Sequence, residues 1–312
     1  MSKKPVTNTA ASVRQRLLNL AKSRHEDYNA ILLQYGIERF LFRLSQSPHG
    51  DQLVLKGAML FRVWVADLHR PTLDVDFLGV GDPSPLATAE LMRRIISIEV
   101  ANDGIEFNAE SVTATEIREG QKYGGIRVRL EAALGTARIP IQLDVGFGDV
   151  VVPDAAKRLF PTLLDHDAPQ LKMYPPETVV AEKLQALTVL GIANSRMKDF
   201  FDLWIIARQF RFDGVTLTKA IRATFDRRET PIPAEMPFGL TDAFGDDRQK
   251  QQQWRAFRKR LQLNDAPDEL KAVIDHVRVF VALPLACALT GEPSKSHWLP
   301  GGPWGTPPSP RS

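Results

Sequence analysis

The sequence is poor in cysteine. Cys287 is the only one in 312 residues, which excludes a disulfide framework and fits a reducing cytosol. The six histidines show no metal-ligand spacing, so we expect no zinc site. The N-terminus lacks the apolar core of a signal peptide, and we find no apolar run as long as a membrane span. These absences predict a cytoplasmic protein that does not bind a membrane.

Neither sign of charge is in large excess. The chain has 40 Lys and Arg against 37 Asp and Glu, for a net charge of +3, which permits a nucleic-acid partner without demanding one. Hydrophobic residues make up 44% of the sequence. A chain of this length and composition can build one large or two ordinary domains, each with a proper core.

Residues 72–77, TLDVDF, alternate polar and apolar side chains, which is typical of a half-buried strand. Thr72, Asp74 and Asp76 then share one face, and the two carboxylates repel each other unless a cation lies over them. A hard divalent cation such as Mg²⁺ takes oxygen ligands and leaves positions for phosphates. Two such ions can activate a hydroxyl and steady a leaving pyrophosphate. The alternative is that both aspartates are the solvated face of an edge strand.

A glycine turn precedes this strand. Lys56, Gly57 and Ala58 lie between a short apolar run and a segment with helical spacing. Glycine at a strand-to-helix turn lets backbone N–H groups approach a triphosphate, and a helix N-terminus favours the anion. We therefore expect these three residues, together with Thr72, to bind a nucleotide.

The order of glycine turn, helix and [ST]-x-D-x-D resembles the polymerase-β type nucleotidyltransferase signature. In particular, LVLKGAMLF followed by RPTLDVDFLG is similar to the opening motif of the AbiEii/AbiGii toxin family. In that family an L-K-G-G or L-K-G-A turn precedes R-x-[ST]-x-D-[IV]-D. The wider superfamily commonly has Gly or Ser where this chain has Ala58, so a side-chain hydroxyl to the triphosphate is missing. The resemblance implies an α+β fold: a polymerase-β-like core, with a mixed or antiparallel sheet flanked by helices, and a helical C-terminal half.

A third carboxylate is expected on a neighbouring strand. Residues 126–130 and 139–145 alternate cleanly and predict an antiparallel hairpin, with Asp144 on the face away from its apolar side chains. A lone strand aspartate is usually plain surface. Polymerase-β type domains, however, need a third carboxylate beside D-x-D, and the family's third motif resembles IQLDVGFGD. We take Asp149, further along, for a turn residue.

A second signal lies in residues 177–210. By spacing alone, Lys183 is a solvated helix residue, and Asp199 and Asp202 share a face near a helix start, where the dipole favours negative charge. The pattern A-E-K-L followed by R-x-K-D-x-x-D-L is similar to the family's fourth motif. That resemblance implies that Lys183 binds the triphosphate and that Asp199 is an active-site acid, with Asp202 and Lys198 structural.

We expect three regions along the chain: residues 1–150 as the nucleotidyltransferase core with its N-terminal helices, 151–290 as a helical domain that completes the cleft, and 291–312 as a disordered tail rich in Gly and Pro. A helix across residues 242–261 interleaves six basic residues with two aromatic ones. The aromatics indicate a buried stripe and the charges a solvated face; contact with nucleic acid is the alternative. The residues are Arg248, Lys250, Trp254, Arg255, Phe257, Arg258, Lys259 and Arg260.

The sequence thus predicts Mg²⁺-dependent transfer of a nucleoside monophosphate from an NTP to an acceptor hydroxyl, with Asp74, Asp76 and Asp144 as metal ligands in a two-metal site. The resemblance implies a toxin of a bacterial toxin–antitoxin or abortive-infection (phage-defence) pair, with a cognate antitoxin and an RNA acceptor such as the tRNA 3′ end. Two alternatives stay open. One is a small-molecule nucleotidyltransferase of the antibiotic-modifying kind, and the other is a catalytically inactive binding module, which Ala58 supports.

Overall fold

The chain folds into two compact units. The first comprises Met1–Gly148 and Ala156–Met173, and the second Asp149–Ala155 and Tyr174–Ser312. The first unit's long stretch ends at Gly148, near the expected boundary at residue 150. Its second stretch lies beyond that boundary, because it forms two strands of the first unit's sheet. The structure is a computed structural model and describes residues 8–65, 74–117, 124–263 and 265–306.

Two helices open the first unit, as expected. They are α1 (Thr9–Arg24) and α2 (Tyr28–Gln46). The N-cap of α1 is Asn8, whose side-chain oxygen accepts a hydrogen bond from the N–H of Ala11 at 2.9 Å. Its buried stripe consists of Val13, Leu17 and Ala21.

A seven-stranded sheet in the order β3-β4-β5-β2-β1-β7-β6 forms the first unit's scaffold. The β2–β5 and β1–β7 pairs are parallel and the other pairs antiparallel, so the sheet is mixed and the α+β prediction is confirmed. Strand β3 has an irregularity between Asn108 and Thr113. The strands are β1 (Leu53–Lys56), β2 (Asp74–Gly79), β3 (Ile105–Ile117), β4 (Gly125–Leu134), β5 (Ala137–Phe147), β6 (Ala156–Leu159) and β7 (Gln170–Met173).

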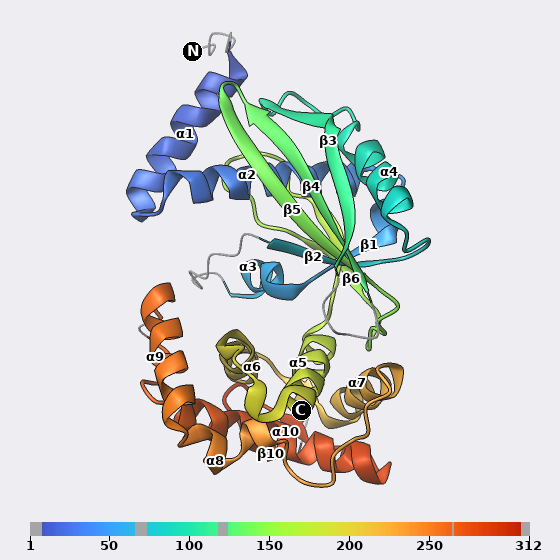
Figure 1. Ribbon diagram of the computed structural model, residues 1–312, viewed down its shortest axis with the longest axis vertical. Helices are drawn as coiled ribbons and strands as arrows, with labels where there is room; N and C mark the ends of the chain where they lie inside the picture. Colours follow the sequence, from blue (N-terminus) through green and yellow to red (C-terminus); the bar gives the residue numbers. More distant parts are fainter. Residues whose placement is uncertain (1–7, 66–73, 118–123, 264, 307–312) are drawn as a thin grey trace, which may run out of the picture. The chain divides into compact units, whose positions relative to one another are not determined.

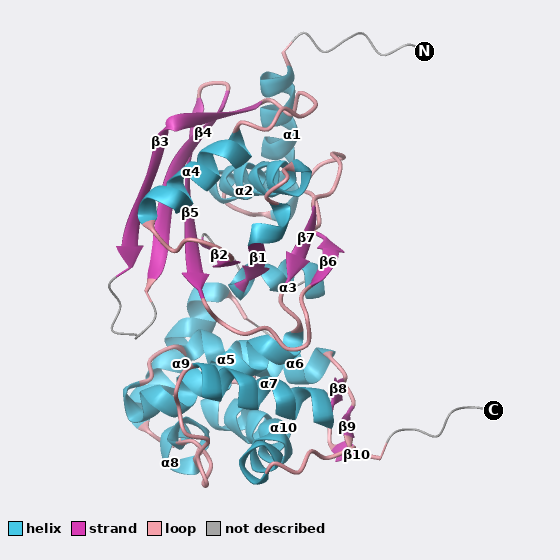
Figure 2. Ribbon diagram, turned by 90° about the vertical axis from the view of Figure 1, so that its right-hand side faces the viewer, coloured by secondary structure: helices cyan, strands magenta, loops and turns pink. Residues whose placement is uncertain are grey.

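Helices α1, α2 and α4 (Pro85–Ile96) cover one face of β3, β4 and β5 (Figure 2). Ser84 caps α4, since its hydroxyl accepts a hydrogen bond from the N–H of Ala87 at 3.2 Å. The side chains between helices and sheet form a tightly buried apolar core. Its strand contribution includes Val75, Phe77, Val128, Leu143 and Val145.

The second unit is helical, which confirms the helical C-terminal half (Figure 1). One helix expected across residues 242–261 is in fact two, because the side chain of Asp247 accepts from the N–H of Lys250 at 2.9 Å and starts a new helix there. The helices are α5 (Pro176–Leu190), α6 (Met197–Gln209), α7 (Gly214–Arg227), α8 (Asp242–Gly245), α9 (Arg248–Leu261) and α10 (Leu270–Thr290).

Helix α10 corrects the statement that no apolar run reaches the length of a membrane span. It has 21 residues, and its most apolar window has a mean hydropathy of 1.8. Polar residues such as Asp275 and Arg278 within it hide this length in the sequence. Half of that window is buried against the rest of the unit, where α10 contacts α6 and α7, as a core helix does.

The C-terminal segment is ordered as far as residue 306, so the expectation of a disordered tail over 291–312 is wrong for that part. Strands β9 (His297–Trp298) and β10 (Trp304–Gly305) form a small sheet with β8 (Phe212–Asp213). The indole N–H of Trp298 donates to the carbonyl of Ala207 at 2.7 Å. Large aromatic side chains bury enough area to order a segment whose Gly and Pro content predicts disorder. Residues 307–312 lie outside the described part.

Candidate active site

The three aspartates predicted on one face of the sheet do share that face. Asp76 on β2 is the register partner of Asp144 on β5, and neighbouring strands lie about 4.8 Å apart. Asp74 lies two residues back along β2, and its carboxylate accepts from the amide of Gln142 at 3.1 Å. The placement inferred from alternation is therefore confirmed, while the catalytic roles of the three residues remain predictions.

Two basic residues extend this row across four strands. Lys56 on β1 is the register partner of Asp76, and Arg127 on β4 is the partner of Asp144. The order across the sheet is thus cation, carboxylate, carboxylate, cation. Each cation thus lies beside one of the two like-charged carboxylates and offsets part of their mutual repulsion. Arg127 could not be recognised from the sequence, because only the strand order places it beside Asp144.

Arg127 binds Asp144 through two parallel hydrogen bonds. Its Nε donates to Oδ1 at 2.9 Å and its Nη2 to Oδ2 at 2.7 Å. The Arg127 side chain is 31% exposed and that of Asp144 19%, so solvent and ligands can reach both. Bidentate pairs of this kind are among the stronger and more directional polar contacts in proteins.

The glycine turn lies directly against the carboxylates. Gly57 has a φ of +73°, which favours glycine, and a β-carbon there would collide with the carboxylate of Asp76. The ammonium of Lys56 lies 3.5 Å from where a β-carbon on Gly146 would stand, so the lysine reaches across β2 towards β5. Ala58 is half-buried in the same turn, and Thr72 lies outside the described residues.

The donor set of the row fits a hard divalent cation, since it consists of carboxylates on adjacent strands of one sheet face. Their side chains are not gathered around one point, however: among the described residues, no three His, Cys, Asp or Glu side chains are grouped closely enough to hold a metal ion. Asp144 is held by Arg127 instead.

The helical unit contains a buried ion cluster around Lys183. Its Nζ lies 2.7 Å from Asp199 Oδ1 and 2.8 Å from Asp202 Oδ2. Side-chain exposure is 16% for the lysine and 1% and 2% for the aspartates. Arg196 adds a second partner for Asp199, with Nε 2.9 Å from Oδ2. The spacing of three residues places both aspartates on one face of α6, so Asp202 is as close a partner of Lys183 as Asp199 is.

The charges of this cluster reinforce one another. Burial alone lowers the pKa of Lys183, but the two aspartates outweigh it and raise that pKa above its ordinary value. Burial alone raises the pKa of Asp199, and the nearby Lys183 and Arg196 outweigh it and lower that pKa. Lys183 and Asp199 are therefore both charged at neutral pH.

Asp149 is more than a turn residue. Its Oδ1 accepts from Arg228 Nη2 at 3.0 Å, and the same guanidinium lies 3.2 Å from Glu182 on α5. The hydroxyl of Thr178 also bonds the backbone N–H and carbonyl of Val152, each at 2.9 Å. These contacts hold residues 149–155 to the helical unit. The pairing of Asp149 with Arg228 could not be predicted, because the two residues are far apart in the sequence.

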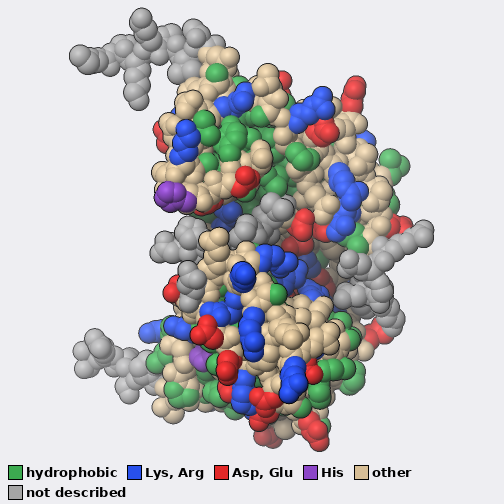
Figure 3. All heavy atoms as spheres, turned by 60° about the vertical axis from the view of Figure 1, so that its left-hand side comes forward, with side chains coloured by type: hydrophobic (Ala, Val, Ile, Leu, Met, Phe, Trp, Pro, Cys, Tyr) green, Lys and Arg blue, Asp and Glu red, His purple; other side chains and the backbone are tan. Residues whose placement is uncertain are grey.

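Helix α9 has a buried aromatic side and an exposed basic side. Trp254 is fully buried and Phe257 nearly so, which confirms the predicted stripe. Lys250 belongs to the core, because its Nζ donates to the carbonyl of Asn194 at 2.9 Å. Lys and Arg side chains remain on the surface of this unit (Figure 3). Those exposed on α9 are Arg248, Arg255, Lys259 and Arg260.

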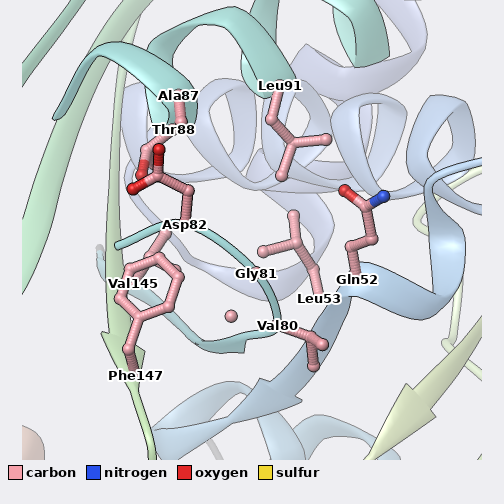
Figure 4. Close-up of a pocket in the computed structure, with 11 residues that line it drawn as sticks. Gln52, Leu53, Val80, Gly81, Asp82, Ala87, Thr88, Leu91, Val145 and Phe147 are labelled. Atoms are coloured by element: carbon pink, nitrogen blue, oxygen red, sulfur yellow. The ribbon is translucent and has the colours of Figure 1, made fainter. Parts of the chain in front are cut away.

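A cavity of about 230 Å³ lies on the helix-covered side of the first unit's sheet (Figure 4). Gly79 and Val145 line it, and both belong to the alternating set opposite Asp74 and Asp144. Thr88 on α4 borders it. The cavity is therefore on the other face of the sheet from the carboxylates, and it is not the candidate site.

A match to a family model supports the interpretation of the sequence as a nucleotidyltransferase. Residues 39–276 match a family model described as nucleotidyl transferase AbiEii toxin, type IV TA system. JHP933 from Helicobacter pylori is similar in structure, with 15% identity and a TM-score of 0.44 over 85% of this chain and 95% of that one. A presumed nucleotidyltransferase from H. pylori gives 15% identity and a TM-score of 0.43 over 85% and 98%. No match was found among curated proteins.

Proposed function

Because the chain belongs to the AbiEii family of nucleotidyltransferase toxins of type IV toxin–antitoxin systems, we propose that it transfers a nucleoside monophosphate from an NTP to a hydroxyl of RNA, such as the 3′ end of tRNA. The observation that carries this proposal is the row of carboxylates. Asp76 and Asp144 are register partners on adjacent strands, with Asp74 beside them and Gly57 packed against Asp76. Pyrophosphate is the leaving group.

Asp74, Asp76 and Asp144 would hold Mg²⁺, which when bound neutralises charge on the triphosphate and makes an attacking hydroxyl more acidic. The residues of the chain itself do the rest of the work. The turn at Gly57 lets backbone N–H groups approach the phosphates, and Lys56 supplies a positive charge from β1. Asp144 would help to orient the acceptor hydroxyl or to take its proton. Lys183 is proposed to bind the triphosphate.

An RNA acceptor is supported by the exposed basic side of α9, because an RNA backbone must be neutralised by several cations. The family also implies a cognate antitoxin as the partner of this toxin, and we place the pair in the cytoplasm.

The test incubates the protein with each radiolabelled NTP, Mg²⁺ and total RNA. We expect label on RNA, falling steeply with added salt. Asp76→Asn should reduce labelling by at least about 100-fold, which is roughly 2.7 kcal/mol of barrier, because a neutral amide is a poor ligand for a hard cation. Asp82→Asn is the matched control, since Asp82 is exposed and lies after the end of β2.

Two results would contradict the proposal. Label that appears only on small molecules, with flat salt dependence, would favour the small-molecule enzyme. A folded protein that labels nothing with any NTP would favour the inactive binding module.

A further inference from the structure

The bidentate contact between Arg127 and Asp144, called the clasp below, is one that a ligand can reach. Both oxygens of the carboxylate accept from one guanidinium, so the edge that would bind a cation faces the arginine. The pair is only partly buried, with 31% of the Arg127 side chain exposed. An incoming anion can therefore reach the guanidinium without any unfolding of the sheet.

The position of this pair in the row shows which repulsion between carboxylates the arginine offsets. Asp76 and Asp144 are neighbours of like charge, which is unfavourable until a cation lies between them. Arg127 compensates one end of the row and Lys56 reaches in from the other. While the clasp is closed, the described residues contain no group of three carboxylate, histidine or cysteine side chains arranged to hold a metal ion.

We propose that Arg127 is a positioning residue that exchanges partners: it holds Asp144 while the site is free of nucleotide and transfers to a phosphate of the incoming triphosphate, which releases Asp144. The inference rests on the proposed function. A guanidinium fork matches carboxylate and phosphate equally well in shape. A triphosphate carries several negative charges against one on Asp144, so the exchange is favoured once it arrives. The acid would thus become available only when substrate is present.

Arg129 supplies a matched comparison within the same strand. It lies two residues from Arg127 on the same face of β4, but its register partner is the neutral Gln142, and its side chain is exposed. Any general effect of positive charge on this face should appear for both arginines. An effect of the clasp should appear for Arg127 alone.

The experiment measures two binding constants on the intact, nucleotide-free protein. Mn²⁺ binding is followed by electron paramagnetic resonance, and inorganic tripolyphosphate, which has no base to recognise, is titrated calorimetrically without metal. Arg127→Met should bind Mn²⁺ about tenfold more tightly, because it removes a competing cation from Asp144, and tripolyphosphate about tenfold more weakly, because it loses a fork of donors. Arg127→Lys should keep part of the phosphate affinity, and Arg129→Met should change neither constant by more than about twofold.

The opposite signs separate the clasp from simpler roles. A residue that merely shapes the site would weaken both ligands when replaced, and that result in folded Arg127→Met and Arg127→Lys would overturn the inference. So would unchanged binding of both ligands, or equal effects at Arg129. If the variants behave as expected but the wild type transfers no nucleotide, the proposed function fails and the ligand exchange stands. If the wild type labels RNA and Arg127→Met binds both ligands as the wild type does, only the exchange fails.

Discussion

Replacing Lys183 with methionine should destabilise the helical unit. The substitution keeps the apolar stem and removes the ammonium that lies between two carboxylates exposed by only 1% and 2%. Breaking a buried ion pair costs about 3 to 5 kcal/mol, because a charge held away from water loses the cation that compensated it. Arg196 still pairs with Asp199, so we expect the lower end, about 3 kcal/mol, or a fall in Tm of roughly 10 °C for a unit of this size.

The pH dependence of this loss follows from the direction of the pKa shifts. In the wild type the pKa of Asp199 is lowered, so the stability that it contributes is present above about pH 4, its unfolded value, and is lost as pH falls through the folded value. Without Lys183, burial is opposed by fewer cations, so the pKa of Asp199 is higher in the folded variant than in the folded wild type, and the variant takes up a proton more readily. Lowering the pH from 7 to 5 should therefore narrow the gap between wild type and variant.

The assay is chemical denaturation followed by circular dichroism at both pH values. Lys198→Met is the matched control. Lys198 is exposed on α6, directly before Asp199, and its replacement should cost less than about 0.5 kcal/mol. Adding Asp202→Asn to Lys183→Met removes one of the two buried carboxylate charges and should restore part of the loss. A single variant within about 1 kcal/mol of wild type, with no narrowing at pH 5, would show that the cluster is well solvated and refute the reasoning.

Two further substitutions test the turn and the C-terminal segment. Gly57→Ala should cost about 1 to 3 kcal/mol of stability and abolish RNA labelling, because its methyl group would displace the carboxylate of Asp76. Its control is Gly124→Ala, where a β-carbon meets nothing within 4 Å, and this variant should match wild type in both labelling and denaturation. Trp298→Ala should cost about 3 to 5 kcal/mol in the same denaturation assay. Leu299→Ala changes a side chain that is 40% exposed and should cost under about 1 kcal/mol. A loss of stability for Trp298→Ala as small as that for Leu299→Ala would show that the segment is not docked.

Local patterns are enough to predict much of the candidate site. A period of two along a strand determines which face a side chain occupies, so Asp74, Asp76 and Asp144 could be assigned to one face without knowing the strand order. The start of α5 at Pro176 and its end at Gly191 also follow from local chemistry. Such inferences need only residues close together in the sequence.

The missing parts depend on contacts between distant segments. Arg127 matters because β4 pairs with β5, and Lys56 because β1 pairs with β2, and alternation along one strand does not reveal its neighbours. Asp202 looks like an ordinary helix residue until α5 brings Lys183 to it. In the C-terminal segment, the Gly and Pro content predicts disorder, and only the partners of Trp298 show that it folds.

The strand order also affects how the chain avoids aggregation during its synthesis. β1, with the apolar sequence LVLK, has β7 as one of its two neighbours, and β7 follows residues 149–155, which belong to the other unit. A chain that stops at Gly148 therefore leaves β1 as an apolar edge, a ready template for intermolecular pairing. Continuing through Met173 seals that edge with two short strands. The outermost, β6, is exposed throughout and carries Lys157 and Arg158, charges that discourage further strands from adding.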